Sequence, residues 1–203
     1  MVTRELEAFV RAALPPPPAR VLEIGAGRGE LAVALGEAGY SMTAVDPAAE
    51  PGGIVQPSSV LEVQGSFDAT VSVVALHHID PLAESCEHVA AMLGPGSPWV
   101  IDELDIDRYD ERAMRWWVSQ RRALGVAEHE HEPDGILDHL REHIHSLETM
   151  LAALAPHFEF GRPVPGPYLH RWELCPSLYA AEVDLIAGGL LPAVGCRFIA
   201  TRK

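Results

Sequence analysis

The fold is decided by residues 21–31, which read Val21-Leu22-Glu23-Ile24-Gly25-Ala26-Gly27-Arg28-Gly29-Glu30-Leu31. The stretch begins as an apolar run typical of a buried strand, turns on glycines at alternate positions, and continues as a helix. Glycines let the backbone approach a ligand closely, and the first turn of a helix offers unpaired N–H groups. Residues 21–31 therefore predict a nucleotide-like binding turn between a strand and a helix.

The spacing of these glycines narrows the class of ligand. The dinucleotide fingerprint G-x-G-x-x-G, counted from Gly25, requires Gly or Ala where this chain has Glu30. A diphosphate at the start of this helix would also meet the carboxylate of Glu23. The turn therefore favours a ligand with an ammonium group and no phosphate, which speaks against a nicotinamide-dependent oxidoreductase.

Residues 21–29 resemble the first motif of the class I S-adenosylmethionine (SAM)-dependent methyltransferases of the small-molecule type, close to the bacterial types 11 and 12. The resemblance implies transfer of a methyl group from SAM to an O, N or C atom of a small-molecule acceptor, with S-adenosylhomocysteine (SAH) as product. Three further stretches resemble that family in order and spacing: Thr43–Pro47, Phe67–Ile79 with its Leu-His-His end, and Leu93–Glu103.

Alternating strands and helices predict an α/β fold with a mostly parallel sheet. We expect a Rossmann-like, doubly wound sheet of seven strands with an antiparallel last strand. The chain is expected to form a single domain over residues 1–203, with an N-terminal helix and proline linker in residues 1–19 and a helical lid insertion in residues 105–155. Expected strands are 20–24, 41–45, 54–56, 69–75, 99–104, 158–162 and 195–201, and one long helix is expected over 136–154.

The resemblance implies which residues hold the cofactor. A carboxylate at Glu23 suits the ammonium group of SAM, and Asp46 at the end of the second strand suits both ribose hydroxyls. Ser59 and Val60 lie where the family contacts adenine, and the Leu76 carbonyl is placed to accept from the ammonium group. The full expected set is Glu23, Gly25, Ala26, Gly27, Asp46, Pro47, Ser59, Val60, Leu76 and His77.

Two histidines are candidates for catalysis. His78, near the methyl donor, is able to take a proton from a hydroxyl or amine acceptor, or else to orient the loop by bonding to backbone. His143 lies on the flank of an apolar helical stripe, where it either lines an acceptor pocket or belongs to a solvated helix face. Methyl transfer often needs little beyond positioning, so a base is optional.

The histidines between residues 129 and 145 raise the question of a metal. His139 and His143 are four residues apart, but the motif H-E-x-x-H is absent, so no metal site is expected. An aromatic-rich group with an Arg and a His favours either a pocket for a planar acceptor, neutral or anionic, or a core. Its members are Trp116, Trp117, Tyr168, His170, Arg171 and Trp172.

Composition restricts the partners. The chain has 203 residues and a formal net charge of −14, which argues against nucleic-acid or anionic-membrane partners. Three cysteines without C-x-x-C spacing, and no apolar run long enough to span a bilayer, favour the cytoplasm. The oligomeric state is left open. The short segment around the third strand leaves one alternative open, a SAM-binding protein without transferase activity.

Overall fold

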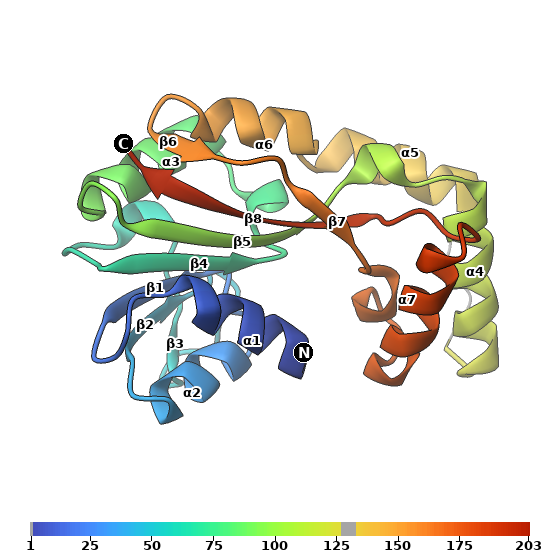
Figure 1. Cartoon of the computed structure of the whole chain (residues 1–203), viewed down its shortest axis with the longest axis horizontal. Coiled ribbons are helices and arrows are strands. Elements are labelled where there is room, and N and C mark those ends of the chain that lie inside the picture. The colour runs from blue at the N-terminus through green and yellow to red at the C-terminus, as the bar shows by residue number, and fades with distance from the viewer. Residues whose placement is uncertain (1, 127–132) are drawn as a thin grey trace.

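The computed structural model describes residues 2–126 and 133–203 (Figure 1). Eight strands of this part of the chain form one sheet in the order β3-β2-β1-β4-β5-β8-β6, with β7 also paired to β8. Strands β1 to β5 run parallel, and β8 runs antiparallel to its neighbours. The strands are β1 Arg20–Ile24, β2 Ser41–Val45, β3 Val55–Gln56, β4 Ala69–Val73, β5 Pro98–Leu104, β6 Phe158–Phe160, β7 Val164–Gly166 and β8 Gly195–Arg202.

Helices cover both faces of the sheet because its central strands are apolar on both sides. Val21 of β1 packs into a core under α1 and α2, whereas the next residue, Leu22, packs into the core under α3 and α6. Figure 1 shows α1 and α2 on one face and α3 and α6 on the other. Their bounds are α1 Arg4–Ala13, α2 Glu30–Glu37, α3 Leu82–Met92 and α6 Leu147–Leu154.

A further apolar core lies beyond the carboxyl ends of the parallel strands. There α4, α5 and α7 stand at the end of the sheet toward which β4 points (Figure 1). Leu104, Trp117 and Leu169 are buried in this core. The helices are α4 Glu111–Ala123, α5 Pro133–His143 and α7 Tyr179–Ala187, and short 3-10 turns occupy Val60–Glu62, Leu76–His78, Ile106–Arg108, Leu169–Arg171 and Pro176–Leu178.

The prediction of one helix over 136–154 was wrong, because the chain breaks between His143 and Leu147. Ser146 caps the second helix, its hydroxyl accepting from the Thr149 amide at 3.2 Å. In the break, the His145 amide donates to the carbonyl of His77 at 2.9 Å. Helix α6 therefore packs with α3 on the sheet face, and of the expected helical insertion α4 and α5 stand over the end of the sheet.

The sheet has one strand more than the predicted seven, and the fold class is otherwise confirmed. Residues 163–167 lie outside the expected strands but include β7, which pairs with the first part of β8 while β6 pairs with its last part. The strand expected over 69–75 ends at Val73, since Val74 has a left-handed φ of 56°. Of the helices described, none has the length and apolarity needed to cross a lipid bilayer.

Candidate cofactor and acceptor site

The glycine turn after β1 is joined to both neighbouring strands. The amides of Gly25 and Ala26 donate to the carbonyl of Val45 at the end of β2. Gly25 has φ +69°, and a Cβ on it would lie 2.4 Å from the Cβ of Ala75, so only glycine fits. Gly27 has φ +52°, but a Cβ there would meet nothing within 4 Å. The first glycine therefore serves packing, and the second leaves open space beside the turn.

Asp46 faces this turn from the end of β2. Its carboxylate accepts from the Gly27 amide and from the Ala48 amide, each at 2.8 Å. A carboxylate offers about four lone-pair positions, so capacity for two more donors is left. Those two positions match the pair of ribose hydroxyls that the sequence assigned to Asp46.

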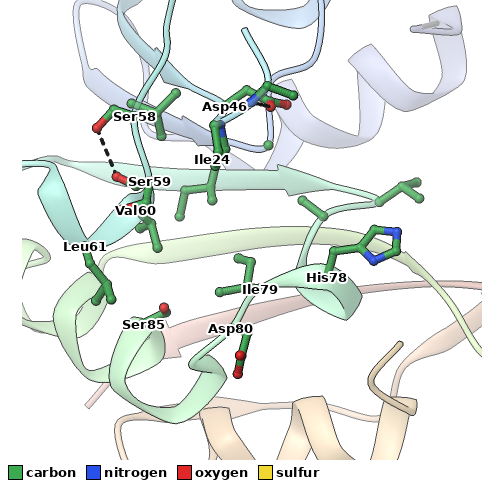
Figure 2. A pocket seen from close by; sticks show the side chains of 16 residues that line it. Ile24, Asp46, Ser58, Ser59, Val60, Leu61, His78, Ile79, Asp80 and Ser85 are labelled. Carbon is green, nitrogen blue, oxygen red and sulfur yellow. Dashed lines mark hydrogen bonds between the residues drawn. The ribbon is translucent and has the colours of Figure 1, made fainter. Parts of the chain in front are cut away.

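Asp46 and Pro47 border a cavity of about 460 Å³, which we call the first cavity. Ser59 and Val60 stand on the opposite side of this cavity from His78 (Figure 2). Ser58, Asp80 and Ser85 are further polar residues of its lining, and apolar side chains suited to an adenine ring supply other parts of the wall. These apolar walls are Ile24, Val45, Leu61 and Ile79.

Glu62 does not take part in this cavity. Its carboxylate accepts from the Ser59 amide at 2.8 Å and from the Ser58 hydroxyl at 3.1 Å, which closes the 3-10 turn at 60–62. Glu62 is therefore not the acidic partner for adenine, and Asp80 is the acid besides Asp46 that lines this cavity.

Glu23 lies in the second cavity, of about 410 Å³, together with Gly25, Ala26, Gly27 and Glu30. The Glu23 side chain is buried, and its Oε2 has no hydrogen-bond partner within the part of the chain that the structure describes. Burial raises the pKa of Glu23 to about 7. Glu23 lines this cavity, and its unpaired buried carboxylate oxygen fits a ligand that brings its own cation, such as the ammonium group of SAM.

The exit of β4 is held by a residue that sequence reasoning missed, Glu103. Its Oε1 accepts from the amides of Ala75 and Leu76, each at 2.7 Å. Its Oε2 accepts from the Leu104 amide at 3.1 Å and from Nδ1 of His77 at 2.8 Å. The available signal was the pair of consecutive acids, Asp102-Glu103, inside an otherwise apolar strand.

The two expected cofactor residues at this exit lie away from the first two cavities. Leu76 is fully buried, and its carbonyl accepts from the Ile79 amide at 3.1 Å. His77 is also buried, and it lines the third cavity instead. The geometry thus brings together eight of the ten expected cofactor residues and sets Leu76 and His77 apart from them.

The third cavity has a volume of about 220 Å³ and lies between the end of the sheet and α5. Val74 and His78 line both this cavity and the first one, so the two meet at these residues. Burial and the neighbouring His77 lower the pKa of His78, which keeps its imidazole neutral near pH 7. We call this cavity the aromatic pocket; its lining is Val74, His77, His78, Leu104, Tyr109, Leu140, Ile144, Tyr168 and Trp172.

The other expected catalytic histidine lies elsewhere. His143 is exposed, with its Nδ1 at 2.7 Å from the carbonyl of His139. The residues of this region that line the aromatic pocket are Leu140 of α5 and Ile144, which comes directly after α5. His129 and His131 lie outside the described residues, and the described part of the chain contains no group of three potential metal ligands.

Some residues of the predicted aromatic group line the aromatic pocket, and others pack behind those residues. Tyr168 and Trp172 line the pocket, whereas Trp117 is fully buried and stacks on Trp172 from behind, with ring centroids 4.3 Å apart. Arg171 is paired with the buried carboxylate of Asp102 at 2.6 Å. Asp102 also pairs with Arg197, so one carboxylate is shared by two guanidinium groups. Arg171 does not line the aromatic pocket, so the pocket walls offer no cation to an anionic acceptor.

Sheet order, antiparallel last strands and cavities at the carboxyl edge together define a Rossmann-like class of nucleoside-binding enzymes. The sequence model of a family described as "Methyltransferase domain" matches residues 2–154. The chain belongs to this family, and its identification as a class I SAM-dependent methyltransferase is confirmed. SAM is the cofactor of that family.

Solved structures have the same fold. A SAM-dependent methyltransferase from Mesorhizobium loti superposes with a TM-score of 0.60 at 20% identity, covering 99% of this chain and 98% of that one. The 1,6-didemethyltoxoflavin-N1-methyltransferase of Burkholderia thailandensis, with bound 1,6-didemethyltoxoflavin and SAH, gives a TM-score of 0.58 at 19% identity, covering 98% of this chain and 77% of that one.

The alignment with a curated relative covers a smaller part of the chain. An uncharacterized methyltransferase of Staphylococcus carnosus is 28% identical over an alignment of 116 positions that covers 50% of this chain. The match spans 56% of that relative, so the chain covers little more than half of the relative's length.

Proposed function

We propose that the chain transfers a methyl group from SAM to an O, N or C atom of a small-molecule acceptor. The observation that carries the proposal is that three neighbouring cavities share lining residues. The first and second share Gly25, and the first and third share Val74 and His78. A donor lying across Gly25 would therefore present its reactive group to an acceptor in the aromatic pocket.

In this proposal each part of the donor has a chemically matched group. Glu23 holds the ammonium group, Gly25, Ala26 and Gly27 supply close backbone, and Asp46 with Pro47 holds the ribose. Ser59 and Val60 border the adenine. The bound cofactor supplies an electrophilic methyl group, and His78, on the boundary between donor and acceptor cavities, fixes the approach of the acceptor.

The net charge and the free cysteines of the chain support a small-molecule acceptor within the cytoplasm. A formal net charge of −14 disfavours nucleic acid and anionic membranes. Cys86, Cys175 and Cys196 are all free thiols, in keeping with a reducing compartment. We further propose a single domain in which α4 and α5 cover the acceptor, since α6 lies on the sheet face.

Calorimetric titration of the purified chain with SAH, with NAD as control, tests the donor site. Micromolar binding of SAH alone is expected, because Glu23 and Glu30 border the second cavity and would repel a diphosphate. Incubation with methyl-labelled SAM and a set of small acceptors, followed by mass spectrometry, then tests transfer. Binding of NAD instead of SAH would reject the proposal, and SAH binding without turnover on any acceptor would favour a SAM-binding protein without transferase activity.

A further inference from the structure

The walls of the aromatic pocket define what kind of molecule it accepts. Among the described residues that line it, none is Asp, Glu, Lys or Arg, and the walls are aromatic and aliphatic apart from two histidines. A cavity of about 150 Å³ is known to hold benzene, so a volume of about 220 Å³ suits one ring or two fused rings. A charged molecule would lose its hydration here without gaining a counter-ion.

The aromatic wall is also held rigidly, which favours a flat ligand. Trp117 donates from its Nε1 to the carbonyl of Trp172 at 2.7 Å while their rings stack. Tyr109 meets Trp172 edge-on, with centroids 5.9 Å apart. Buried Glu182 accepts from the amides of Tyr168 and Leu169 at 2.7 and 2.8 Å. Side chains fixed in this way lose little entropy when a ring binds against them.

The hydrogen bonds of Glu103 determine the tautomer of His77. Four donors reach the Glu103 carboxylate: the amides of Ala75, Leu76 and Leu104, and Nδ1 of His77. These four fill the lone-pair positions of a carboxylate, so no proton fits on Glu103 and Nδ1 of His77 carries the hydrogen. In the neutral imidazole, the Nε2 of His77 is then an unprotonated acceptor.

The Nε2 of His77 is free to accept a proton. It has no hydrogen-bond partner among the described residues, and His77 lines the aromatic pocket. A carboxylate on Nδ1 orients the ring and stabilises the cation that forms when Nε2 is protonated. His78, which lines the same pocket, has no carboxylate hydrogen-bonded to its ring within the described part of the chain.

We propose that the aromatic pocket binds a neutral, planar acceptor of one or two rings carrying an O–H or N–H, and that His77, positioned by Glu103, takes its proton. The inference rests on the proposed methyl transfer. The acceptor's lone pair forms the new bond to the methyl carbon, the carbon–sulfur bond breaks with its electron pair staying on sulfur, and the acceptor's proton goes to Nε2 of His77. His77 then returns this proton to solvent, and Glu103 remains ionised throughout.

The test uses the purified full chain saturated with SAH and the probe 4-nitrophenol, whose ionised form absorbs at longer wavelength. Calorimetry with SAH alone comes first, because failure of that step removes the proposed function itself. With SAH bound, we expect 4-nitrophenol to bind and its ionised fraction to exceed that of the free probe at the same pH. Benzoate and benzylamine, which carry charges, are expected to bind about tenfold more weakly or not at all.

Variants then separate the two histidines. His77→Asn keeps a donor for Glu103 but lacks Nε2, so the ionised fraction of the bound probe should fall to that of the free probe with little change in affinity. Glu103→Gln should move the pH profile of probe ionisation upward in pH while SAH still binds. His157→Gln, at the far end of β8 beside Lys203, is the matched control and should behave as wild type.

Three results would overturn the inference while leaving the donor site intact. The first is that SAH binds and 4-nitrophenol does not. The second is that benzoate binds as tightly as 4-nitrophenol. The third is that His78→Asn, and not His77→Asn, abolishes ionisation of the bound probe, which would make His78 the base.

Discussion

The amide of Gly27 donates to the carboxylate of Asp46 across the carboxyl edge of the sheet, with an N–O distance of 2.8 Å. This bond fixes the carboxylate beside the turn and leaves acceptor positions for a diol. We predict that Asp46→Asn weakens SAH binding by about 10- to 100-fold, since hydrogen bonds to a charged group contribute about 1.5–3 kcal/mol. Calorimetry with SAH measures the effect.

Asp68→Asn is the control for this variant. Asp68 pairs with Arg20 at the start of β1, the opposite edge of the sheet from Asp46. Its replacement should leave SAH affinity unchanged. Unchanged affinity in Asp46→Asn would remove Asp46 from the donor site.

The two glycines of the turn should respond differently to alanine. Gly25→Ala places a Cβ 2.4 Å from the Cβ of Ala75, so we predict destabilisation of about 2–4 kcal/mol from overpacking and a left-handed backbone together. Gly27→Ala meets no neighbour and should cost only about 1 kcal/mol. Urea denaturation gives both free energies of unfolding.

The same variants separate packing from ligand contact. Gly27→Ala should weaken SAH binding in a stable protein, because its Cβ enters the cavity that Gly27 lines. In Gly25→Ala with Ala75→Gly the clash is removed, and part of the lost stability should return. Equal stability of the two single variants would contradict the packing role of Gly25.

Much of the donor site could be predicted from the sequence because it depends on short, local patterns. The strand, turn and helix of residues 21–31 and the acid after β2 are set by neighbours in the chain, and the structure brings Glu23, Gly27 and Asp46 to one edge. The parallel order of β1 to β5 follows from the same alternation of strands and helices.

The acceptor side was less predictable because it depends on distant contacts. His143 was placed by helical periodicity, but the break at 144–146 is fixed by the His145 amide donating to the carbonyl of His77, 68 positions away in the chain. The role of Glu103 likewise depends on four donors from two strand ends. Only the Ser146 cap and the adjacent acids Asp102-Glu103 carried local signals.

Trp117 supports the aromatic wall of the pocket from behind, so its replacement should destabilise the protein. We predict that Trp117→Ala lowers the free energy of unfolding by about 3–5 kcal/mol, because this fully buried ring stacks on Trp172 and bonds to its carbonyl. Trp117→Phe keeps a ring there and loses the hydrogen bond, which should cost about 1 kcal/mol from that bond alone. Trp116→Ala, at a half-buried position, is the control and should cost less than Trp117→Ala.

Glu23 should make stability depend on pH in the unusual direction for a carboxylate. Burial raises its pKa from 4.5 to about 7 in the folded chain, so between these values the folded state binds more protons than the unfolded state. The contribution of Glu23 to the free energy of unfolding is therefore complete below pH 4.5. This contribution, about 3 kcal/mol, is lost as the pH rises to 7. Glu23→Gln should unfold at a higher temperature than wild type at pH 8 and at a similar temperature at pH 5.

The same carboxylate should couple SAH binding to proton release. The ammonium group of SAH stabilises the ionised form of Glu23, so binding at pH 6.5 should expel a proton that the free protein holds with a pKa of about 7. Calorimetry in buffers of different ionisation enthalpy counts this proton, and wild-type affinity should rise from pH 6 to pH 8. In Glu23→Gln both the proton release and the pH dependence should disappear, and affinity at pH 8 should fall by at least about tenfold. If wild type releases no proton, the ammonium group does not lie at Glu23. The destabilisation by this buried carboxyl group would then not be explained by cofactor binding.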